Sequence, residues 1–169
     1  MTVQTPLEFA DETDLKCVSI FAYLAGIIDG EGSIYVFRVH EKGKGPIYHR
    51  IEMNITNTNP WIVLYAQYVF GGTIRKKDPN RYKGRFGLRT CYSWQVQSAD
   101  AERALLQLYP YLFLKQKQAR LCLIMRFMKR SCKRLTPELV ELRDKIWQQV
   151  KDANHTIERY GLPEEFQCQ

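Results

Sequence analysis

Two carboxylates, Asp29 and Glu31, come after an apolar segment that starts at Leu24. They alternate with two glycines, Gly30 and Gly32. The apolar segment predicts a helix, and the glycines predict its end. A helix carboxyl terminus carries partial negative charge, so each acid there is unfavourable by about 0.3–1 kcal/mol. Hard divalent cations bind carboxylate and carbonyl oxygens, and a bound cation would remove this conflict. The segment therefore indicates a metal-binding helix end, although an ordinary buried helix with a glycine cap also fits.

One stripe of the same predicted helix carries small side chains at the spacing i, i+3, i+4, i+7. It consists of Ala22, Ala25, Gly26 and Asp29, whereas large apolar residues occupy another stripe. A glycine in a helix interior costs about 1 kcal/mol relative to alanine. Close packing against a second helix would offset this cost, so the small stripe is a candidate helix–helix contact.

Composition indicates one globular domain, because the 169 residues are 45% hydrophobic and 12% aromatic. We expect a core over about residues 18–153, an N-terminal extension over 1–14 and a tail over 154–169. The acidic first residues do not resemble a secretion or transit peptide, and no apolar run reaches the about 20 residues of a membrane span. Five widely spaced cysteines indicate reduced thiols and argue against a zinc site. These features favour the cytoplasm of a prokaryote or the interior of an organelle over secretion.

The net charge of +7 is concentrated in two blocks. Residues 75–89 hold seven bases and one acid, and residues 115–134 hold eight bases and no acid. A solvated surface would ordinarily mix both signs of charge, so this distribution favours a polyanionic partner such as nucleic acid.

Apolar periodicity predicts a helix, a hairpin, a second helix, a second hairpin and further helices, in the order αββαββα plus C-terminal helices. Strands are expected over 33–40, 48–56, 73–77 and 85–97. Asn59 and Pro60 are typical of the start of the second helix, in which Trp61, Leu64 and Tyr68 hold the 3.6-residue period, and Gly71-Gly72 ends it. The expected fold is α+β, with a four-stranded antiparallel sheet covered by helices on one face.

The other face of this sheet is expected to carry polar and basic side chains, a composition also found on solvated sheet faces. Arginine and lysine bind guanine in the major groove, asparagine and glutamine bind adenine, and glutamate accepts a hydrogen bond from cytosine. The strands place the following residues on this face: Arg50, Glu52, Asn54, Arg75, Lys77, Arg85, Arg89, Ser93, Gln95 and Gln97.

The segment LAGIIDGEGSI, residues 24–34, resembles the signature of the LAGLIDADG homing endonucleases, whose fold has the order αββαββα. The resemblance extends over roughly residues 20–150. It includes further segments that are similar to the family: Ile55–Pro60, Tyr92–Val96, Pro110–Leu112 and Leu114–Ala119.

The resemblance implies a role for five residues. Glu31 stands at the metal-binding acid of the family, and the backbone carbonyl of Gly30 occupies the adjoining ligand position. Asp29 corresponds to a structural acid, Lys115 to the lysine of the catalytic pocket, and Asn57 to a polar residue that orients solvent. In the family a basic pocket residue usually follows a few positions later, where this sequence has Asn59-Pro60. The resemblance does not identify which residue takes that role here.

The resemblance also implies a magnesium-dependent endonuclease that cuts both strands of double-stranded DNA, with Mn²⁺ or Ca²⁺ able to replace Mg²⁺ in binding. One copy of the motif implies a homodimer joined through the small stripe, a near-palindromic site, and neither membrane nor organic cofactor. Besides the sheet face, the DNA contacts implied are Tyr35, Phe37, Lys42, Lys44, Tyr48 and Lys117. An RNA maturase or a binding module of the same fold that does not cleave is the alternative.

Overall fold

The computed structural model describes residues 12–40, 47–77, 89–131 and 136–155. The chain begins with α1, β1 and β2, followed by α2, β3 and β4, and then by three further α-helices and a short 3₁₀ helix. The bounds are α1 Glu12–Glu31, β1 Gly32–His40, β2 Ile47–Asn57, α2 Pro60–Phe70, β3 Thr73–Lys77, β4 Cys91–Gln97, α3 Ser98–Leu108, η4 Tyr109–Tyr111, α4 Gln116–Ser131 and α5 Pro137–His155. The predicted order of elements is confirmed, and the described part of the fourth strand starts at Cys91.

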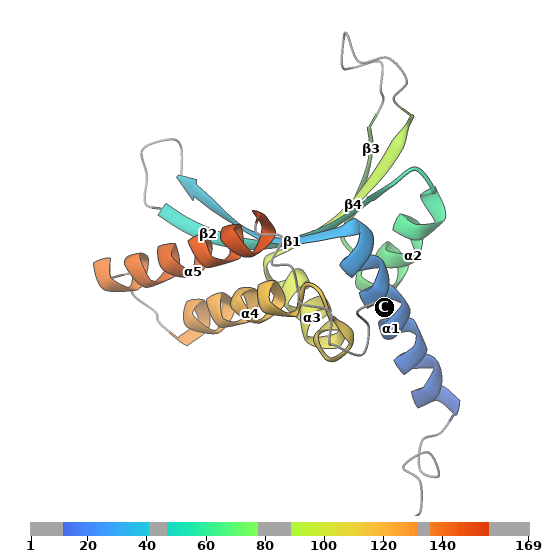
Figure 1. Ribbon diagram of the computed structural model, residues 1–169, viewed down its shortest axis with the longest axis horizontal. Coiled ribbons are helices and arrows are strands. Elements are labelled where there is room, and N and C mark those ends of the chain that lie inside the picture. The colour runs from blue at the N-terminus through green and yellow to red at the C-terminus, as the bar shows by residue number, and fades with distance from the viewer. Residues whose placement is uncertain (1–11, 41–46, 78–88, 132–135, 156–169) are drawn as a thin grey trace, which may run out of the picture.

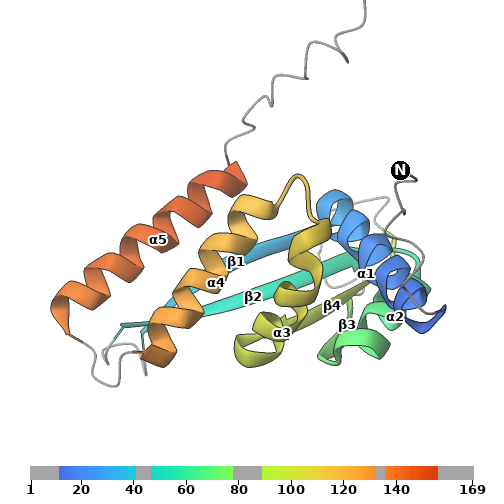
Figure 2. The same cartoon turned by 90° about the horizontal axis from the view of Figure 1, so that it is seen from below.

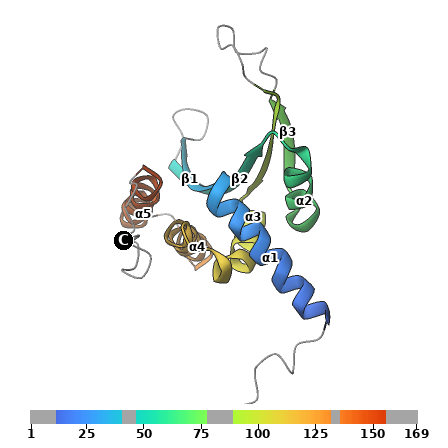
Figure 3. The same cartoon turned by 45° about the vertical axis from the view of Figure 1, so that its right-hand side comes forward.

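The four strands form one antiparallel sheet in the order β1-β2-β4-β3, so β1 and β3 are its edge strands. Helices α5, α4, α3 and α1 lie side by side across one face of the sheet (Figure 2). Figure 1 shows the same helices beneath β1 and β2, and no described element covers the face above them. Figure 3 shows the last turn of α1 at the sheet and its first turns extending away from it, with α2 close to β3. The predicted α+β fold with helices on one face is confirmed.

Alternation of side chains along the strands explains this two-layer arrangement. Residues of three strands point toward the helices and form the buried core: Ile34, Val36, Ile51, Met53, Ile55, Trp94 and Val96. Leu24 and Ile28 of α1 complete this core from the helix side. Since successive residues of a strand point to opposite faces, burial of these positions directs their neighbours to the open face.

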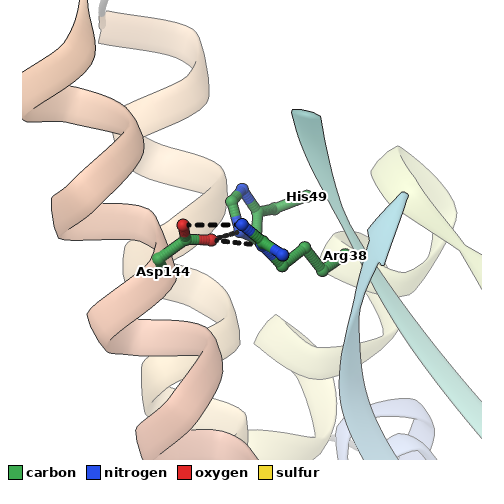
Figure 4. A network of polar contacts seen from close by, with 3 residues as sticks. All are labelled: Arg38, His49 and Asp144. Atoms are coloured by element: carbon green, nitrogen blue, oxygen red, sulfur yellow. Dashed lines mark hydrogen bonds and ion pairs between the residues drawn. The ribbon is translucent and has the colours of Figure 1, made fainter. Parts of the chain in front are cut away.

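Helix α5 is attached to β1 and β2 by a polar network rather than by apolar contacts alone (Figure 4). The carboxylate of Asp144 accepts hydrogen bonds from Arg38 Nε at 2.9 Å and Nη2 at 3.2 Å, and contacts His49 Nε2 at 2.8 Å. Burial lowers the pKa of His49, and this effect outweighs the opposite influence of Asp144. Burial also disfavours ionised Asp144, but its hydrogen bonds to Arg38 and His49 outweigh burial and lower its pKa.

Helix α2 begins and ends as predicted, but its exposed side was not anticipated. The Asn59 side chain accepts from the Trp61 backbone N–H, and the Gly71 N–H donates to the Gln67 carbonyl at 2.7 Å. The buried residues are Val63 and Ala66. The larger residues Trp61, Leu64 and Tyr68 are exposed, because the side of the helix that packs on the sheet is the one that carries Val63 and Ala66.

Gly72 is required by the close approach of α2 to β4. Its φ of +88° is rarely adopted by other residues, and an added Cβ would lie 2.5 Å from the carbonyl oxygen of Gln95. Trp94 Nε1 donates to the Gly71 carbonyl at 2.7 Å and holds the same turn.

None of the helices in the described part of the chain has the length and apolar character that a membrane span requires. The cysteines Cys17, Cys91 and Cys122 are free thiols.

Candidate functional site

The site at the end of α1 contains an exposed carboxylate on a tightly folded junction. Glu31 is the last residue of α1, and β1 begins at the next residue, so the chain leaves the helix without a loop. At Gly32 an added Cβ would lie 2.8 Å from Ile28 Cα and 2.9 Å from its carbonyl oxygen. Gly32 is therefore required by close packing. Neither Gly30 nor Gly32 has a positive φ, so the glycine cap weighed from the sequence is absent.

Asp29 holds a second segment of the chain against this junction. Its Oδ2 accepts the backbone N–H groups of Phe113 and Leu114 at 2.7 and 3.2 Å, and its Oδ1 accepts that of Lys115 at 2.9 Å. A carboxylate is the side chain best able to accept several backbone N–H groups at once. The structure is consistent with the structural role implied for Asp29.

Lys115 lies beside the same helix end, although 84 residues separate it from Glu31 in the sequence. Its ammonium group donates to the backbone carbonyl of Asp29. Burial lowers the pKa of Lys115, while Asp29 and Glu31 act in the opposite direction. The exposed acid Glu31 follows the contacted Asp29 carbonyl by two residues, so both groups belong to the same helix end.

Glu31 is available to a ligand, because within the described part of the chain no hydrogen bond or ion pair engages its carboxylate. Asn57 ends β2, two residues beyond Ile55, which pairs with Gly32. It therefore lies at the same end of the sheet as Glu31. Its Oδ1 accepts the backbone N–H of Asn59 at 2.8 Å, so its NH₂ group is the part that could orient solvent.

The sheet register brings most of the predicted DNA-contacting side chains to one open face. Side chains from β1 and β2 form one half of it, where the Arg50 guanidinium lies 5.4 Å from the centre of the Phe37 ring. The other half comes from β3 and β4. The predicted residues that the register places on this face are Tyr35, Phe37, Tyr48, Arg50, Asn54, Arg75, Lys77 and Gln95, with Gln97 beside them.

Two predicted contact residues on this face are not accessible. Glu52 is only 2% exposed and accepts a hydrogen bond from the Tyr35 hydroxyl, which in turn accepts from Asn54 Nδ2 at 3.0 Å. Ser93 is also buried, and its hydroxyl pairs with that of Thr56 at 2.9 Å. The expectation that Glu52 and Ser93 contact bases is corrected, because both side chains are buried. Tyr35 engages one Glu52 oxygen, and the other lies 3.8 Å from Arg50 Nη2 without a hydrogen bond. Glu52 instead supports Tyr35.

The remaining predicted contacts divide between other surfaces and undescribed segments. Arg89 is exposed just before β4. Lys117 lies on α4 and lines a groove between α4 and α5, in the helix layer rather than on the open sheet face. Lys42, Lys44 and Arg85 lie outside the described residues.

The second basic block is partly neutralised within the chain. Glu102 of α3 is buried, with Arg126 Nε at 3.0 Å and Arg130 Nη1 at 2.9 Å from its carboxylate. Charge counting along the sequence did not anticipate this pairing, because Glu102 lies outside the block. These two arginines therefore hold α3 against α4, and they are not evidence for a polyanionic partner.

The four residues of the predicted small stripe of α1 do not all lie on an exposed side of the helix. Ala25 has no exposed surface and belongs to the core, and Asp29 faces the segment before α4. Their assignment to a dimer interface is corrected, because α1 packs on the sheet with the side that bears Ala25. Ala22, Gly26 and Gly30 lie four residues apart on α1 and are exposed, and an added Cβ at Gly26 or Gly30 meets nothing within 4 Å.

Sequence reasoning missed the contribution of α5. Lys151 and Asn154 of its last turns line a pocket together with Lys115, and the Asn154 Nδ2 donates to the carbonyl of Ile34 at 2.9 Å. The only signal in the sequence was the amphipathic period of the helix, which does not reveal the strand against which it packs.

No protein-family model matches the chain, and no curated protein matches it significantly. Solved structures do resemble it. The homing endonuclease I-CvuI in complex with its target in the presence of Ca is 22% identical, with 85% of this chain and 87% of that chain covered and a TM-score of 0.69. The archaeal intron-encoded homing endonuclease I-Vdi141I, complexed with DNA, is 17% identical, with 84% and 86% covered and a TM-score of 0.63.

A third structure, I-SmaMI bound to uncleaved DNA target in the presence of calcium ions, is 17% identical with a TM-score of 0.63. The match covers 86% of this chain but 46% of that one. A second solved structure shows I-SmaMI, a LAGLIDADG homing endonuclease, bound to cleaved DNA. At these identities the likeness establishes the fold: the chain has the fold of the LAGLIDADG homing endonucleases, as the sequence resemblance implied.

Proposed function

We propose that this chain is a metal-dependent, site-specific endonuclease of the intron-homing type that cleaves both strands of double-stranded DNA as a homodimer. One observation carries the proposal. The exposed Glu31 carboxylate stands at the end of α1, two residues beyond the Asp29 carbonyl that the Lys115 ammonium contacts. This helix end lies next to an open sheet face that carries arginine, lysine and amide side chains. The solved structures with this fold are named as homing endonucleases, several of them with DNA, which supports the same activity.

The chemistry of the helix end fits a divalent cation. Glu31 offers an exposed carboxylate with no described partner. Gly30 adds a carbonyl from the last turn, where backbone carbonyls lack partners within the helix. Both are hard oxygen ligands of the kind that Mg²⁺ prefers, and Mn²⁺ or Ca²⁺ would occupy the same ligands for binding. When bound, the metal would activate water and stabilise the leaving oxygen.

The protein side chains supply the remaining functions. Lys115 would place its ammonium group near the scissile phosphate and stabilise negative charge as it develops there. Asp29 positions that lysine by holding the backbone of residues 113–115. Asn57 would orient the attacking water through its NH₂ group, since its oxygen is engaged in the turn.

A second copy of the chain would complete the site. Among the described residues no group of three or more His, Cys, Asp or Glu side chains could hold a metal. At this helix end one chain would therefore offer one carboxylate, that of Glu31, together with the Gly30 carbonyl. The exposed stripe of Ala22, Gly26 and Gly30 would let two α1 helices approach closely about a twofold axis and place both Glu31 residues side by side. A twofold dimer would require a near-palindromic DNA site, with one sheet on each half.

The test of the activity is cleavage of a randomised duplex library in Mg²⁺, followed by sequencing of the broken ends. We expect defined double-strand breaks from the wild type. Glu31→Gln should abolish cleavage and leave DNA binding intact, whereas Glu141→Gln, a change of an exposed acid on α5, should alter neither. Tight binding with no product in Mg²⁺ or Mn²⁺ would favour the alternative, a binding module or RNA maturase.

The test of the dimer uses Gly26, whose replacement the isolated chain should tolerate. Gly26→Leu should convert the dimer to a monomer in light scattering and abolish cleavage of both strands. Gly26→Ala, which adds one methyl group, is the matched control. A dimer that persists in Gly26→Leu would show that the interface lies elsewhere.

A further inference from the structure

A pocket of about 410 Å³ opens at the outer edge of β1, where the last turns of α5 meet the residue before α4. Its lining contains two lysines and no carboxylate. The polar lining residues are Ser33, Tyr35, Asn54, Lys115, Lys151 and Asn154. The two ammonium groups, the Ser33 hydroxyl and the second N–H of each asparagine amide are donors that can bind an oxyanion. The Tyr35 hydroxyl, in contrast, already donates to Glu52.

The position of Lys151 is set by two attachments of α5 to β1. At one point Asp144 pairs with Arg38, and at the other Asn154 donates to the Ile34 carbonyl. The ten residues between the two α5 positions span about 15 Å of helix, and the four residues between the two β1 positions span about 13 Å of strand. Because these lengths agree, the last turns of α5 are held along the edge strand.

Two further contacts orient the lysines. Val150 is buried against the core, which fixes the rotation of α5 and directs the neighbouring Lys151 to the surface. The Lys151 ammonium lies 5.5 Å from the centre of the Trp147 ring. The Lys115 ammonium donates to the Asp29 carbonyl.

The pocket joins the two parts of the proposed DNA site. Tyr35 and Asn54 are residues of the open sheet face, while Lys115 belongs to the segment that Asp29 holds at the end of α1. An anion in this pocket would therefore lie between the base-contacting face and Glu31. A duplex lying on the sheet presents its phosphodiester backbone at such an edge.

We propose that this pocket binds one phosphate of the DNA backbone near the cleaved bond, with Lys151 as a phosphate-binding residue. The inference rests on the proposed function, because it takes duplex DNA as the ligand. Lys151 would position the backbone over β1 and contribute affinity without contacting the reacting atoms.

The first test measures how duplex binding depends on salt, because each neutralised phosphate contributes about 0.9 to the slope of log K against log salt. Lys151→Gln should lower that slope by about 0.9, and Lys151→Arg should retain it. Lys145→Gln is the matched control, since Lys145 is an exposed lysine of the same helix and pairs with Glu141 at 2.8 Å. A slope in Lys151→Gln equal to that in Lys145→Gln would overturn the proposal.

The second test is lysine acetylation of the full chain, read by mass spectrometry with and without duplex DNA. We expect DNA to slow the modification of Lys151 and leave that of Lys145 unchanged. Protection of Lys151 by inorganic phosphate but not by DNA would overturn the proposal. A wild-type chain that binds no duplex would refute the proposed function itself, which separates that failure from failure of the pocket.

Discussion

The two carboxylates at the end of α1 are predicted to have separable roles, and substitution of each should reveal them. Asp29→Ala should destabilise the fold, because the Asp29 carboxylate accepts three backbone N–H groups from residues 113–115. Glu31→Gln should leave stability nearly unchanged, because within the described residues no hydrogen bond or ion pair engages the Glu31 carboxylate.

The expected magnitude follows from these contacts. A hydrogen bond to a charged group contributes about 1.5–3 kcal/mol when buried. The groups on residues 113 and 114 lie in an exposed segment, where water replaces part of the loss. We therefore expect Asp29→Ala to lower the free energy of unfolding by about 2–4 kcal/mol. Glu31→Gln removes an acid from a helix carboxyl terminus, which predicts a gain of about 0.3–1 kcal/mol.

Urea denaturation measures both changes as shifts in midpoint at constant m value. Asp29→Asn is the informative intermediate, because one oxygen remains but the NH₂ group faces backbone N–H donors. We expect it to lose nearly as much stability as Asp29→Ala. Glu31→Gln should lose cleavage but keep its stability. Asp29→Ala should lose both cleavage and stability, because the backbone that positions Lys115 is no longer held.

The opposite pattern would refute this reasoning. If Glu31→Gln destabilised the protein as much as Asp29→Ala, Glu31 would have a structural role that its exposure does not reveal. If Asp29→Ala left the unfolding midpoint unchanged, the three hydrogen bonds would contribute nothing, and another contact would hold Lys115 in place.

Three further predictions concern the junction, the pH dependence and the sheet face. Gly32→Ala should destabilise the fold by about 1–3 kcal/mol in urea, since its Cβ would meet the Ile28 backbone; an unchanged midpoint would contradict that contact. Because burial lowers the folded pKa of His49 below its ordinary 6.5, the unfolded chain takes up the proton first, and stability should fall as the pH drops from about 7 to about 5. His49→Gln should flatten this decline in urea midpoints, and an equal decline in the variant would assign it to other groups. Arg75→Ala should weaken duplex binding with a shallower salt slope if Arg75 contacts phosphate; altered base preference at unchanged slope would indicate base contact instead.

Local sequence determined much of this fold. Alternation of apolar residues identified three described strands and the face each one buries, because side-chain direction in a strand follows directly from position. Asn59, Pro60 and Gly71 marked the ends of α2, since capping depends on neighbouring backbone groups. The types and spacing of Asp29 and Glu31 were enough to indicate chemistry at a helix end.

Tertiary structure decided which side of each element remains accessible. Ala25 and Glu52 were predicted to contact partners and are buried, whereas Trp61 and Tyr68 were expected to follow a helical period and are exposed. A helical or strand period gives the relative orientation of residues within one element. It does not say how closely another element covers them.

The site illustrates the same division. Glu31 could be singled out from the sequence, but the contact of Lys115 with Asp29 and the pocket lined by Lys151 depend on the packing of segments far apart in the chain. Helix α5 reaches this helix end because it runs along β1, held by Asp144 and Asn154. The start of α4 is held there by Asp29 instead. The local sequence specifies which groups can do chemistry, and long-range packing specifies which of them meet.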